Sequence, residues 1–517
     1  MMAFLRRFAT RIHGVLSGWD RLRLKGTLRQ LAFPRGMSGF LFGVGVPFKQ
    51  FKSYAFDASQ QVVHATQQLA QLQQRPLQYL SRGNIDKEAL ARQIAQRDGI
   101  TTGLIAVFSA LEMGSSYDVS SNRDTQRLQL HYRPRKCLHY YHYYFDPIFG
   151  FMHTRLQTWF PFTMQICLNG REWLAGQLDH AGIAYQKRDN CFVHIADLER
   201  AQQLADLQSR ADWPQLLDAI ARRTNPVHDQ IFAKRPQQYY WSTEQSEWAT
   251  DILFRNPDDL AQLYPQWVHH GIERLSCKDV LRFLARSEKP TPHFQGEVQA
   301  SKKVRREGVR LKFWRAQNSL KMYDKQDVLL RVETTLNHVA DFKSFHAPEG
   351  QPDAKPAWRT MRKGVADLPR RAEVSQAANE RLLKSLATVA ETTSVATLAE
   401  EVCQPTRWQG RSARALNPLA PDDARLLAAI HTGEFLTNGF RNRDLRSLLF
   451  GDQDDSPQLR KQQSAKVTRH LRLLRAHGLI KKVNQTHRYL LTEKGATIVA
   501  ALLAARQADP AKLNLDP

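Results

Sequence analysis

Residues 421 to 507 carry the pattern that most restricts how this chain can fold. Asp422 to Ile430 and Asn442 to Leu449 are predicted as two amphipathic helices, and Leu459 to His477 as a longer third one. Alternating residues from Lys481 to Leu491 then predict a β-hairpin. The order helix, helix, helix, hairpin predicts a small separate domain at this end of the sequence.

The third predicted helix separates apolar from cationic side chains. Val467, Leu471 and Leu474 fall on one stripe, and the basic residues stay off it. The apolar stripe would anchor the helix and the basic side would face outward. Such a helix fits the major groove of DNA, and the hairpin could reach an adjacent groove or backbone. The nucleic-acid contacts expected here are Gln463, Lys466, Arg469, Arg472, Arg475, Lys481, Lys482 and Arg488.

The string from Leu471 to Ile480, followed by Tyr489 to Gly495, resembles the recognition helix, wing and closing helix of winged-helix DNA-binding domains of the MarR-like kind. The resemblance implies DNA contact and leaves a homodimer open. Winged helices also serve as protein-interaction modules, so that alternative stays open too. As a whole, the chain is similar to long bacterial proteins that are classified only by a winged-helix domain at their C-terminal end. This similarity implies no mechanism.

The charge of the chain favours the same kind of partner. The 517 residues include 74 Lys and Arg against 50 Asp and Glu, a formal net charge of +24. Such a surface attracts polyanions, so nucleic acid is the predicted partner, with DNA favoured over RNA. An anionic membrane would be attracted by the same charge, but no apolar run approaches the ~20 residues of a spanning helix. We therefore expect no membrane association and a cytoplasmic location.

Length and local pattern together predict an α+β multidomain protein. At ~150 residues per unit, three or four folding units are expected. Mixed N-terminal and central domains with antiparallel strands would precede the C-terminal winged helix-turn-helix. The expected divisions are an N-terminal α/β region at 1–122, an aromatic-rich and basic domain at 123–345, a helix and linker at 346–420, and the winged helix at 421–507.

Three further segments bear on possible sites. Leucines alternate with basic residues from Trp19 to Lys25, which predicts a half-buried strand with a cationic face. Residues 210 to 290 are predicted to be mainly helical. A basic run leads into a predicted strand pair and suggests a second nucleic-acid surface, made of Lys302, Lys303, Arg305, Arg306, Arg310 and Lys312.

The aromatic segment from Cys137 to Asp146 allows three interpretations. His139, His142 and Asp146 could hold a metal ion, although a strand would place His139 on the face opposite the other two. Aromatic-rich strands also form core, which is the commoner outcome. In the third interpretation, exposed tyrosines stack on unpaired bases.

A tyrosine flanked by lysines, Tyr323, precedes Glu333 by ten positions. This segment resembles a motif of rolling-circle replication initiators and related phage replication proteins, in which a tyrosine attacks a phosphodiester and acidic or histidine side chains hold a divalent metal. The resemblance implies that Tyr323 is the nucleophile and Glu333 a metal ligand, with Asp20 as a second acidic candidate. The closely spaced histidine pair of many such enzymes is absent. A tyrosine and an ion-paired glutamate in a basic hairpin are the structural alternative.

Two functions remain open from the sequence. The chain could be a DNA-processing, replication or mobile-element protein, with Mg²⁺- or Mn²⁺-dependent nicking or endonuclease activity. Alternatively, it could be a large MarR-like transcriptional regulator without catalytic activity. A plain winged-helix repressor needs only ~100 to 150 residues, so the residues before the terminal domain must have a further role.

Overall fold

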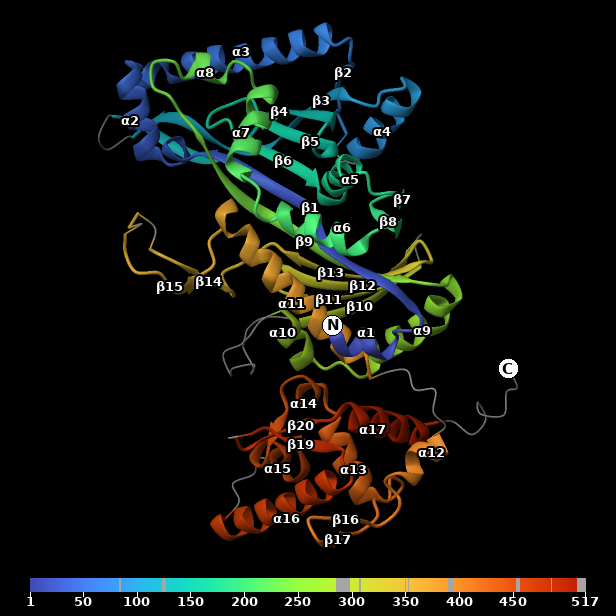
Figure 1. Ribbon diagram of the computed structural model, residues 1–517. Coiled ribbons are helices and arrows are strands. Elements are labelled where there is room, and N and C mark those ends of the chain that lie inside the picture. Colours follow the sequence, from blue (N-terminus) through green and yellow to red (C-terminus); the bar gives the residue numbers. More distant parts are fainter. Residues whose placement is uncertain are drawn as a thin grey trace. The chain divides into compact units, whose positions relative to one another are not determined.

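The computed structural model divides the chain into two compact units, each assembled from segments that are distant in sequence (Figure 1). The sheet unit comprises Val15–Thr250 and Glu333–Gln376. The terminal unit comprises Met1–Gly14, Asp251–Val332 and Ala377–Pro517. The structure describes residues 1–517 except 83–84, 123–126, 285–297, 306–307, 349, 352, 389–394, 452–455, 485 and 509–517.

A mostly antiparallel sheet forms the body of the sheet unit. Three of its strands, β13, β9 and β1, also have residues in the terminal unit. In spatial order the strands are β13 (Leu329–Leu336), β9 (Tyr239–Phe254), β1 (Ile12–Leu28), β6 (Met164–Asn169), β5 (Gly150–Gln157), β4 (Leu128–Asp146), β3 (Gly103–Ser121) and β2 (Leu77–Tyr79). The pairs from β1 to β3 are antiparallel, and β2 runs parallel to β3.

Helices and two small hairpins complete the sheet unit (Figure 1). The helices are α2 (Pro34–Val44), α3 (Phe51–Leu72), α4 (Lys87–Arg97), α5 (Gly170–His180), α6 (Leu198–Gln208), α7 (Trp213–Thr224), α8 (His228–Ile231) and α11 (Leu368–Leu386), whose C-terminal half belongs to the terminal unit. The hairpins are β7 (Tyr185–Arg188) with β8 (Cys191–Ile195), and β14 (Lys343–His346) with β15 (Ala357–Thr360). The expected α+β class with antiparallel strands is confirmed.

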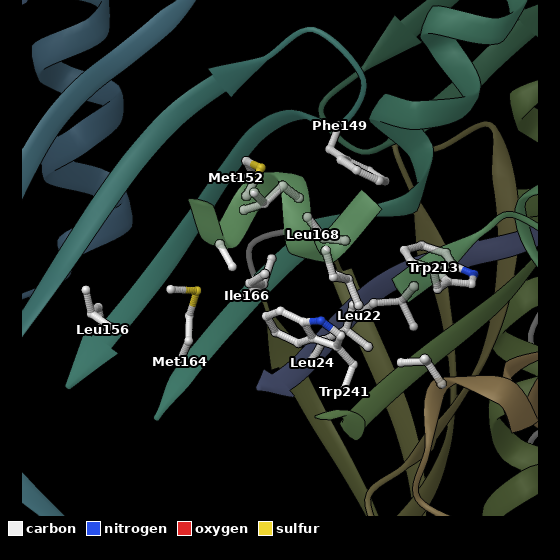
Figure 2. Packing of buried hydrophobic residues seen from close by; sticks show 14 of the residues in the cluster. Leu22, Leu24, Phe149, Met152, Leu156, Met164, Ile166, Leu168, Trp213 and Trp241 are labelled. Atoms are coloured by element: carbon white, nitrogen blue, oxygen red, sulfur yellow. The ribbon is translucent and has the colours of Figure 1, made fainter. Parts of the chain in front are cut away.

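The alternation in β1 has the predicted consequence. Leu22 and Leu24 are fully buried, whereas Arg21 and Arg23 are exposed. Burying a leucine side chain stabilises a fold by about 1.5–3 kcal/mol. Figure 2 shows these leucines in the main core, together with Phe149, Met152, Leu156, Met164, Ile166, Leu168, Trp213 and Trp241.

The second half of strand β4, from His139 to Asp146, is buried on both faces, which explains its aromatic composition. Tyr140 and Tyr144 belong to the main core cluster, whereas Tyr141 and Tyr143 belong to a second cluster that includes residues of α4. Successive strand residues point to opposite faces, so a strand covered on both sides loses its polar alternation. These tyrosines are not available for stacking on bases.

One expected domain boundary does not match the structure, and one region expected to be helical also contains a strand. The boundary at 122/123 falls between β3 and β4, which pair along their whole length in one sheet. Residues 210 to 284 are largely helical, as expected, but the strand β9 interrupts the helices at Tyr239–Phe254. The expected first and second domains therefore share one sheet.

The terminal unit contains a strand meander, helices, and the C-terminal domain. The meander has the order β10 (Val298–Arg305), β11 (Gly308–Arg315), β12 (Asn318–Lys325) and then β13, with helices α1 (Met2–Arg7), α9 (Pro257–Glu273) and α10 (Cys277–Leu284) in the same unit. The C-terminal domain follows as α12 (Val395–Glu400), β16 (Thr406–Trp408), β17 (Arg411–Ala413), α13 (Pro421–Ile430), α14 (Gly433–Asn438), β18 (Phe440–Arg441), α15 (Asn442–Phe450), α16 (Pro457–Ala476), β19 (Ile480–Lys482), β20 (Arg488–Leu491) and α17 (Glu493–Arg506).

The segment expected as a linker before residue 421 packs into the C-terminal domain. Val402 and Leu416 are buried in the same cluster as Leu427 and Leu471. Arg414 donates two hydrogen bonds, of 2.7 and 2.6 Å, to the carboxylate of Asp423 in α13. The domain therefore begins about twenty residues earlier than its helical pattern indicates.

Candidate nucleic-acid interface and carboxylate cluster

Helix α16 presents a cationic side to solvent above an apolar base. Val467, Leu471 and Leu474 are its buried residues. Lys466, Arg469 and Arg472 are exposed, and the helix contains no acidic residue. The predicted separation of the two sides is therefore present in the structure.

The first half of α16 is held in place through α15. The side-chain amide of Asn442 donates to the carbonyl of Ser464 and to the hydroxyl of Thr468, each at 3.0 Å. Ser464 donates back to the Asn442 side-chain oxygen at 3.1 Å. Ser456 caps the helix by accepting from the N–H of Leu459. These contacts fix the orientation of the exposed residues that follow.

The hairpin after α16 adds further cations. Lys481 and Lys482 of β19 are exposed, and Arg488 on β20 is half-buried. Gly495 at the start of α17 lies close to the backbone of Leu479, the residue before β19. A Cβ at position 495 would be 2.0 Å from the Leu479 carbonyl oxygen. This contact packs α17 against the base of the hairpin.

Two of the expected contact residues also face aromatic rings within the domain. The Arg475 guanidinium lies 4.5 Å from the ring centre of Trp408, and the Lys466 ammonium lies 5.6 Å from that of Phe450. Arg475 is half-buried, as is Gln463. Cation–π contact of this kind fixes a side chain without removing its charge. The Arg475 side chain therefore packs against Trp408 of β16 and is less available for contact with DNA than the exposed arginines.

The second basic surface lies on the meander. Lys302 and Lys303 of β10 are exposed, whereas Arg310 and Lys312 of β11 are half-buried. The Lys312 ammonium lies 4.6 Å from the ring centre of Trp314. Arg306 and the side chain of Arg305 lie outside the described residues. The meander therefore offers fewer free cations than the sequence run suggests.

Three carboxylates from three neighbouring strands converge in the sheet unit. They are Asp20 of β1, Glu247 of β9 and Glu333 of β13, named here the carboxylate cluster. One oxygen of each lies within 4.8 Å of the others, and the side chains are only 5%, 9% and 2% exposed. Among the residues that the structure describes, no other group of acidic, histidine or cysteine side chains meets this metal-ligand spacing.

Neighbouring side chains orient the cluster. The amide of Asn190, between β7 and β8, donates to both carboxylate oxygens of Asp20 at 2.9 and 3.2 Å. Gln245 donates to Glu247 at 3.2 Å. Burial opposes the charge on the Arg21 guanidinium, but Glu247, Glu88 and Asp20 outweigh this effect and raise its pKa. The carboxylates of Glu247 and Asp20 therefore favour a positive charge beside them.

The donor set of the cluster fits a hard divalent cation. Mg²⁺ and Mn²⁺ prefer oxygen ligands, and two oxygens on opposite sides of Mg²⁺ are ~4.2 Å apart. Three buried carboxylates at this spacing repel one another unless protons or a cation neutralise them. The residues present are therefore suited to hold such an ion.

The structure brings together two of the three residues expected to be catalytic. Asp20 and Glu333 both belong to the cluster, whereas half-buried Tyr323, on β12, belongs to the terminal unit. Arg331, beside the expected motif, is buried and donates to Asp251 at 2.6 and 2.8 Å. The guanidinium of Arg331 is therefore occupied by a buried carboxylate.

His139, His142 and Asp146 do not form a metal site. Asp146 accepts from the backbone N–H groups of Ile148 and Phe149 and from Arg223. His139 Nδ1 lies 3.0 Å from the Cys137 carbonyl oxygen, and His142 is fully buried beside aromatic rings. The core interpretation of this segment is the one that the structure supports, since alternate strand residues face away from each other.

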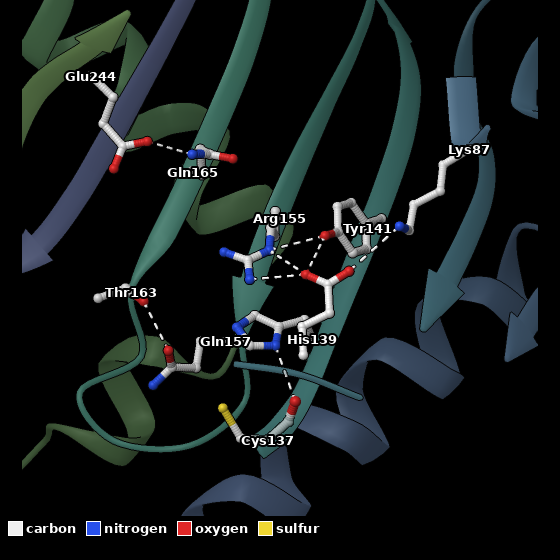
Figure 3. A network of polar contacts seen from close by, with 10 residues as sticks. Lys87, Cys137, His139, Tyr141, Arg155, Gln157, Thr163, Gln165 and Glu244 are labelled. Carbon is white, nitrogen blue, oxygen red and sulfur yellow. Dashed lines mark hydrogen bonds and ion pairs between the residues drawn. The ribbon is translucent and has the colours of Figure 1, made fainter. Parts of the chain in front are cut away.

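Figure 3 shows how polar residues are used on the sheet near this segment. The Glu112 carboxylate accepts from the Tyr141 hydroxyl at 2.6 Å and from Arg155 at 3.0 Å, and it pairs with Lys87 at 3.4 Å. Burial tends to raise the pKa of Glu112, but Tyr141 and Arg155 outweigh burial and hold that pKa below its usual range. This network joins α4, β3, β4 and β5, and it gives Glu112, Tyr141, Arg155 and Lys87 each a polar partner.

Sequence reasoning missed Glu247. The residue lies on β9, in the region expected to be mainly helical. The signal that could have identified the strand is the enrichment of aromatic and β-branched residues in Tyr239–Phe254.

Comparison with known proteins adds no further assignment. Protein-family models, curated proteins and solved structures all gave no match to this chain. Within the described part of the chain, none of the helices has both the length and the apolar character of a membrane span. The chemistry of the two sites must therefore carry the functional argument.

Proposed function

We propose that this chain is a DNA-binding protein in which residues 421–507 form a winged helix with α16 as its recognition helix. The observation that carries the proposal is the exposed, acid-free cationic side of α16 above its buried apolar stripe. The hairpin β19–β20, with Lys481 and Lys482, would act as the wing. A helix of this width enters the major groove of B-DNA, whereas that of RNA is too deep and narrow, so DNA is favoured.

A double variant of α16 tests this function. Arg469→Ala with Arg472→Ala should weaken binding to a DNA duplex by about 1–3 kcal/mol if the two side chains contact phosphate or guanine. The matched control is Arg411→Ala with Arg425→Ala, two exposed arginines elsewhere in the same domain. Affinity is measured by fluorescence anisotropy, and circular dichroism checks folding. Equal affinity of the folded α16 variant and the control would favour a protein-interaction module instead.

A second function, cleavage of a DNA strand, is favoured by one specific observation. The carboxylate cluster places three oxygen donors at metal-ligand spacing in a chain of net charge +24. Bound Mg²⁺ or Mn²⁺ supplies positive charge that stabilises a phosphate under attack. Asp20, Glu247 and Glu333 would hold the ion, and Asn190 would keep the Asp20 carboxylate in orientation. The alternative is a large regulator without catalytic activity.

Ion binding and strand cleavage separate these alternatives. Asp20→Asn, Glu247→Gln and Glu333→Gln should each lower the number of tightly bound Mn²⁺ ions, counted by electron paramagnetic resonance, and should abolish any nicking of plasmid DNA. Glu199→Gln, an exposed carboxylate on α6, is the control. Tyr323→Phe should abolish protein-linked DNA if Tyr323 is the nucleophile. Wild-type protein that binds no Mn²⁺ and nicks no DNA would contradict the second function and leave the regulator.

A further inference from the structure

A cavity of about 690 Å³ opens in the sheet unit between α3 and the strands β3 and β4. Its walls come from the turn before α3, from α3 itself, from both strands, and from Thr158 and Trp159 after β5. Ligand sites in proteins commonly measure ~300–1,000 Å³. The cavity is thus large enough for one nucleotide, and it is separate from α16 and from the carboxylate cluster.

The charge of the cavity is positive. Lys49, Lys52 and Lys136 line it and are exposed, with no ion-pair partner among the described residues. Its acidic lining residue, Asp118, is already paired with Arg133 at 2.5 Å and with Arg135 at 2.9 Å. The hydrogen bond from Arg133 lowers the pKa of Asp118, so the carboxylate is ionised and neutralised by arginine. The three lysines are left to attract an anion.

Aromatic side chains provide the other half of the cavity. Phe56 is 53% exposed, and Phe48 and Trp159 are half-buried. Buried Phe51 and Tyr117 also line the cavity and pack edge-on against each other, and the Tyr117 hydroxyl donates to the Leu31 carbonyl at 2.8 Å. A ligand that covers the exposed ring of Phe56 would gain binding free energy from the apolar surface removed from water. A flat apolar surface beside three cations suits a ligand that is both aromatic and anionic.

We propose that this cavity binds single-stranded DNA, with an unpaired base stacked on Phe56 and Trp159 and the flanking phosphates on Lys49, Lys52 and Lys136. Single-strand sites in proteins combine stacking rings with a basic groove in this way. A duplex cannot bind in this way, because the faces of its bases are covered by neighbouring bases and cannot stack on protein side chains. The choice of DNA as the polymer rests on the proposed function.

Binding of a labelled oligothymidylate of about twelve nucleotides tests this site, a length within the usual range of single-strand sites. The full chain is titrated without divalent cations and followed by fluorescence anisotropy. Phe56→Ala should weaken binding about tenfold. Phe42→Ala, at a phenylalanine that is 90% exposed outside the cavity, should leave affinity unchanged.

A triple lysine variant tests the ionic half of the site. Lys49→Gln, Lys52→Gln and Lys136→Gln together should reduce the slope of log affinity against log salt by about 2, since each single-strand phosphate contact contributes about 0.7. The control carries Arg222→Gln, Lys234→Gln and Lys363→Gln, which are exposed outside the cavity. Thymidine monophosphate is the second ligand. If thymidine monophosphate bound with the same affinity as the oligothymidylate, the cavity would be a free-nucleotide site, and the single-strand proposal would be overturned.

These outcomes are distinct from those for α16. Loss of oligothymidylate binding with duplex binding retained supports the cavity as a separate site. Unchanged oligothymidylate affinity in both cavity variants would overturn the inference and leave duplex binding by α16 intact. Conversely, failure of the α16 variant to affect duplex binding would contradict the proposed function without altering the result for the cavity.

Discussion

His142 on β4 is a histidine that the fold keeps uncharged. Its side chain is fully buried, and its ring lies almost parallel to that of Tyr144 at a centroid distance of 6.3 Å. Burial lowers the pKa of His142 to about 3. Burial, followed by the nearby Arg155, also lowers the pKa of His139 to about 4. Both imidazoles are neutral near pH 7, which suits core residues.

A pH dependence of stability follows from His142. Near its ordinary pKa of 6.5 the unfolded chain takes up a proton that the folded chain does not bind until the pH approaches 3. The free energy of unfolding should therefore fall as the pH drops through this window, by about 2 kcal/mol at pH 5 from His142 alone. His142→Phe should remove that part of the loss.

Urea unfolding of the wild type and of His142→Phe at pH 7 and pH 5 measures the difference. Other buried histidines titrate in both proteins, so only the change between the two proteins reports on His142. An equal loss of stability in both would show that the His142 environment is not the cause.

Strand β9 shows why part of the candidate site could not be predicted. Its residues Ser246, Trp248 and Thr250 are buried, so the strand has no polar alternation for sequence reasoning to detect. Helix α11 supplies a partner for two of these residues, since the Gln376 side chain accepts from Trp248 at 2.8 Å and from Thr250 at 3.1 Å. That partner lies more than a hundred residues away in sequence, so local pattern gives no sign of it; only the aromatic and β-branched composition of β9 could have indicated the strand that carries Glu247.

Helix α16 shows the opposite case. It packs one side on the core and leaves the other in water, so Val467, Leu471 and Leu474 repeat with the helical period. The strand around Trp19 to Lys25 was predictable for the same reason, with leucine inside and arginine outside. Local pattern thus predicted these two elements with one face in water, whereas β9, whose second half is buried on both faces, was missed.

At the scale of the whole molecule, the division of the chain depends on distant pairings. β9 lies between β1 and β13, although more than two hundred residues separate β1 from β9. Composition and local pattern describe only contiguous segments of the chain. They could therefore not predict two units that are each assembled from segments distant in sequence. The same pairings bring Asp20 and Glu333 together, which local motifs alone could not establish.

The net charge of +24 is a property of the whole molecule, and its effect on binding depends on salt. Phosphate neutralisation releases counterions, so log affinity should fall linearly with log salt by about 0.9 for each phosphate contacted. Four or five contacts through α16 and the hairpin would give a slope of about −4.

The most direct test of DNA binding through α16 is therefore the salt dependence of duplex binding by the full chain, with the Arg469→Ala and Arg472→Ala variant beside it. We expect a slope of about −4 for the wild type and about −2 for the variant, as two phosphate contacts are lost. A slope near zero in the wild type, or an identical slope in the folded variant, would contradict DNA recognition by this helix.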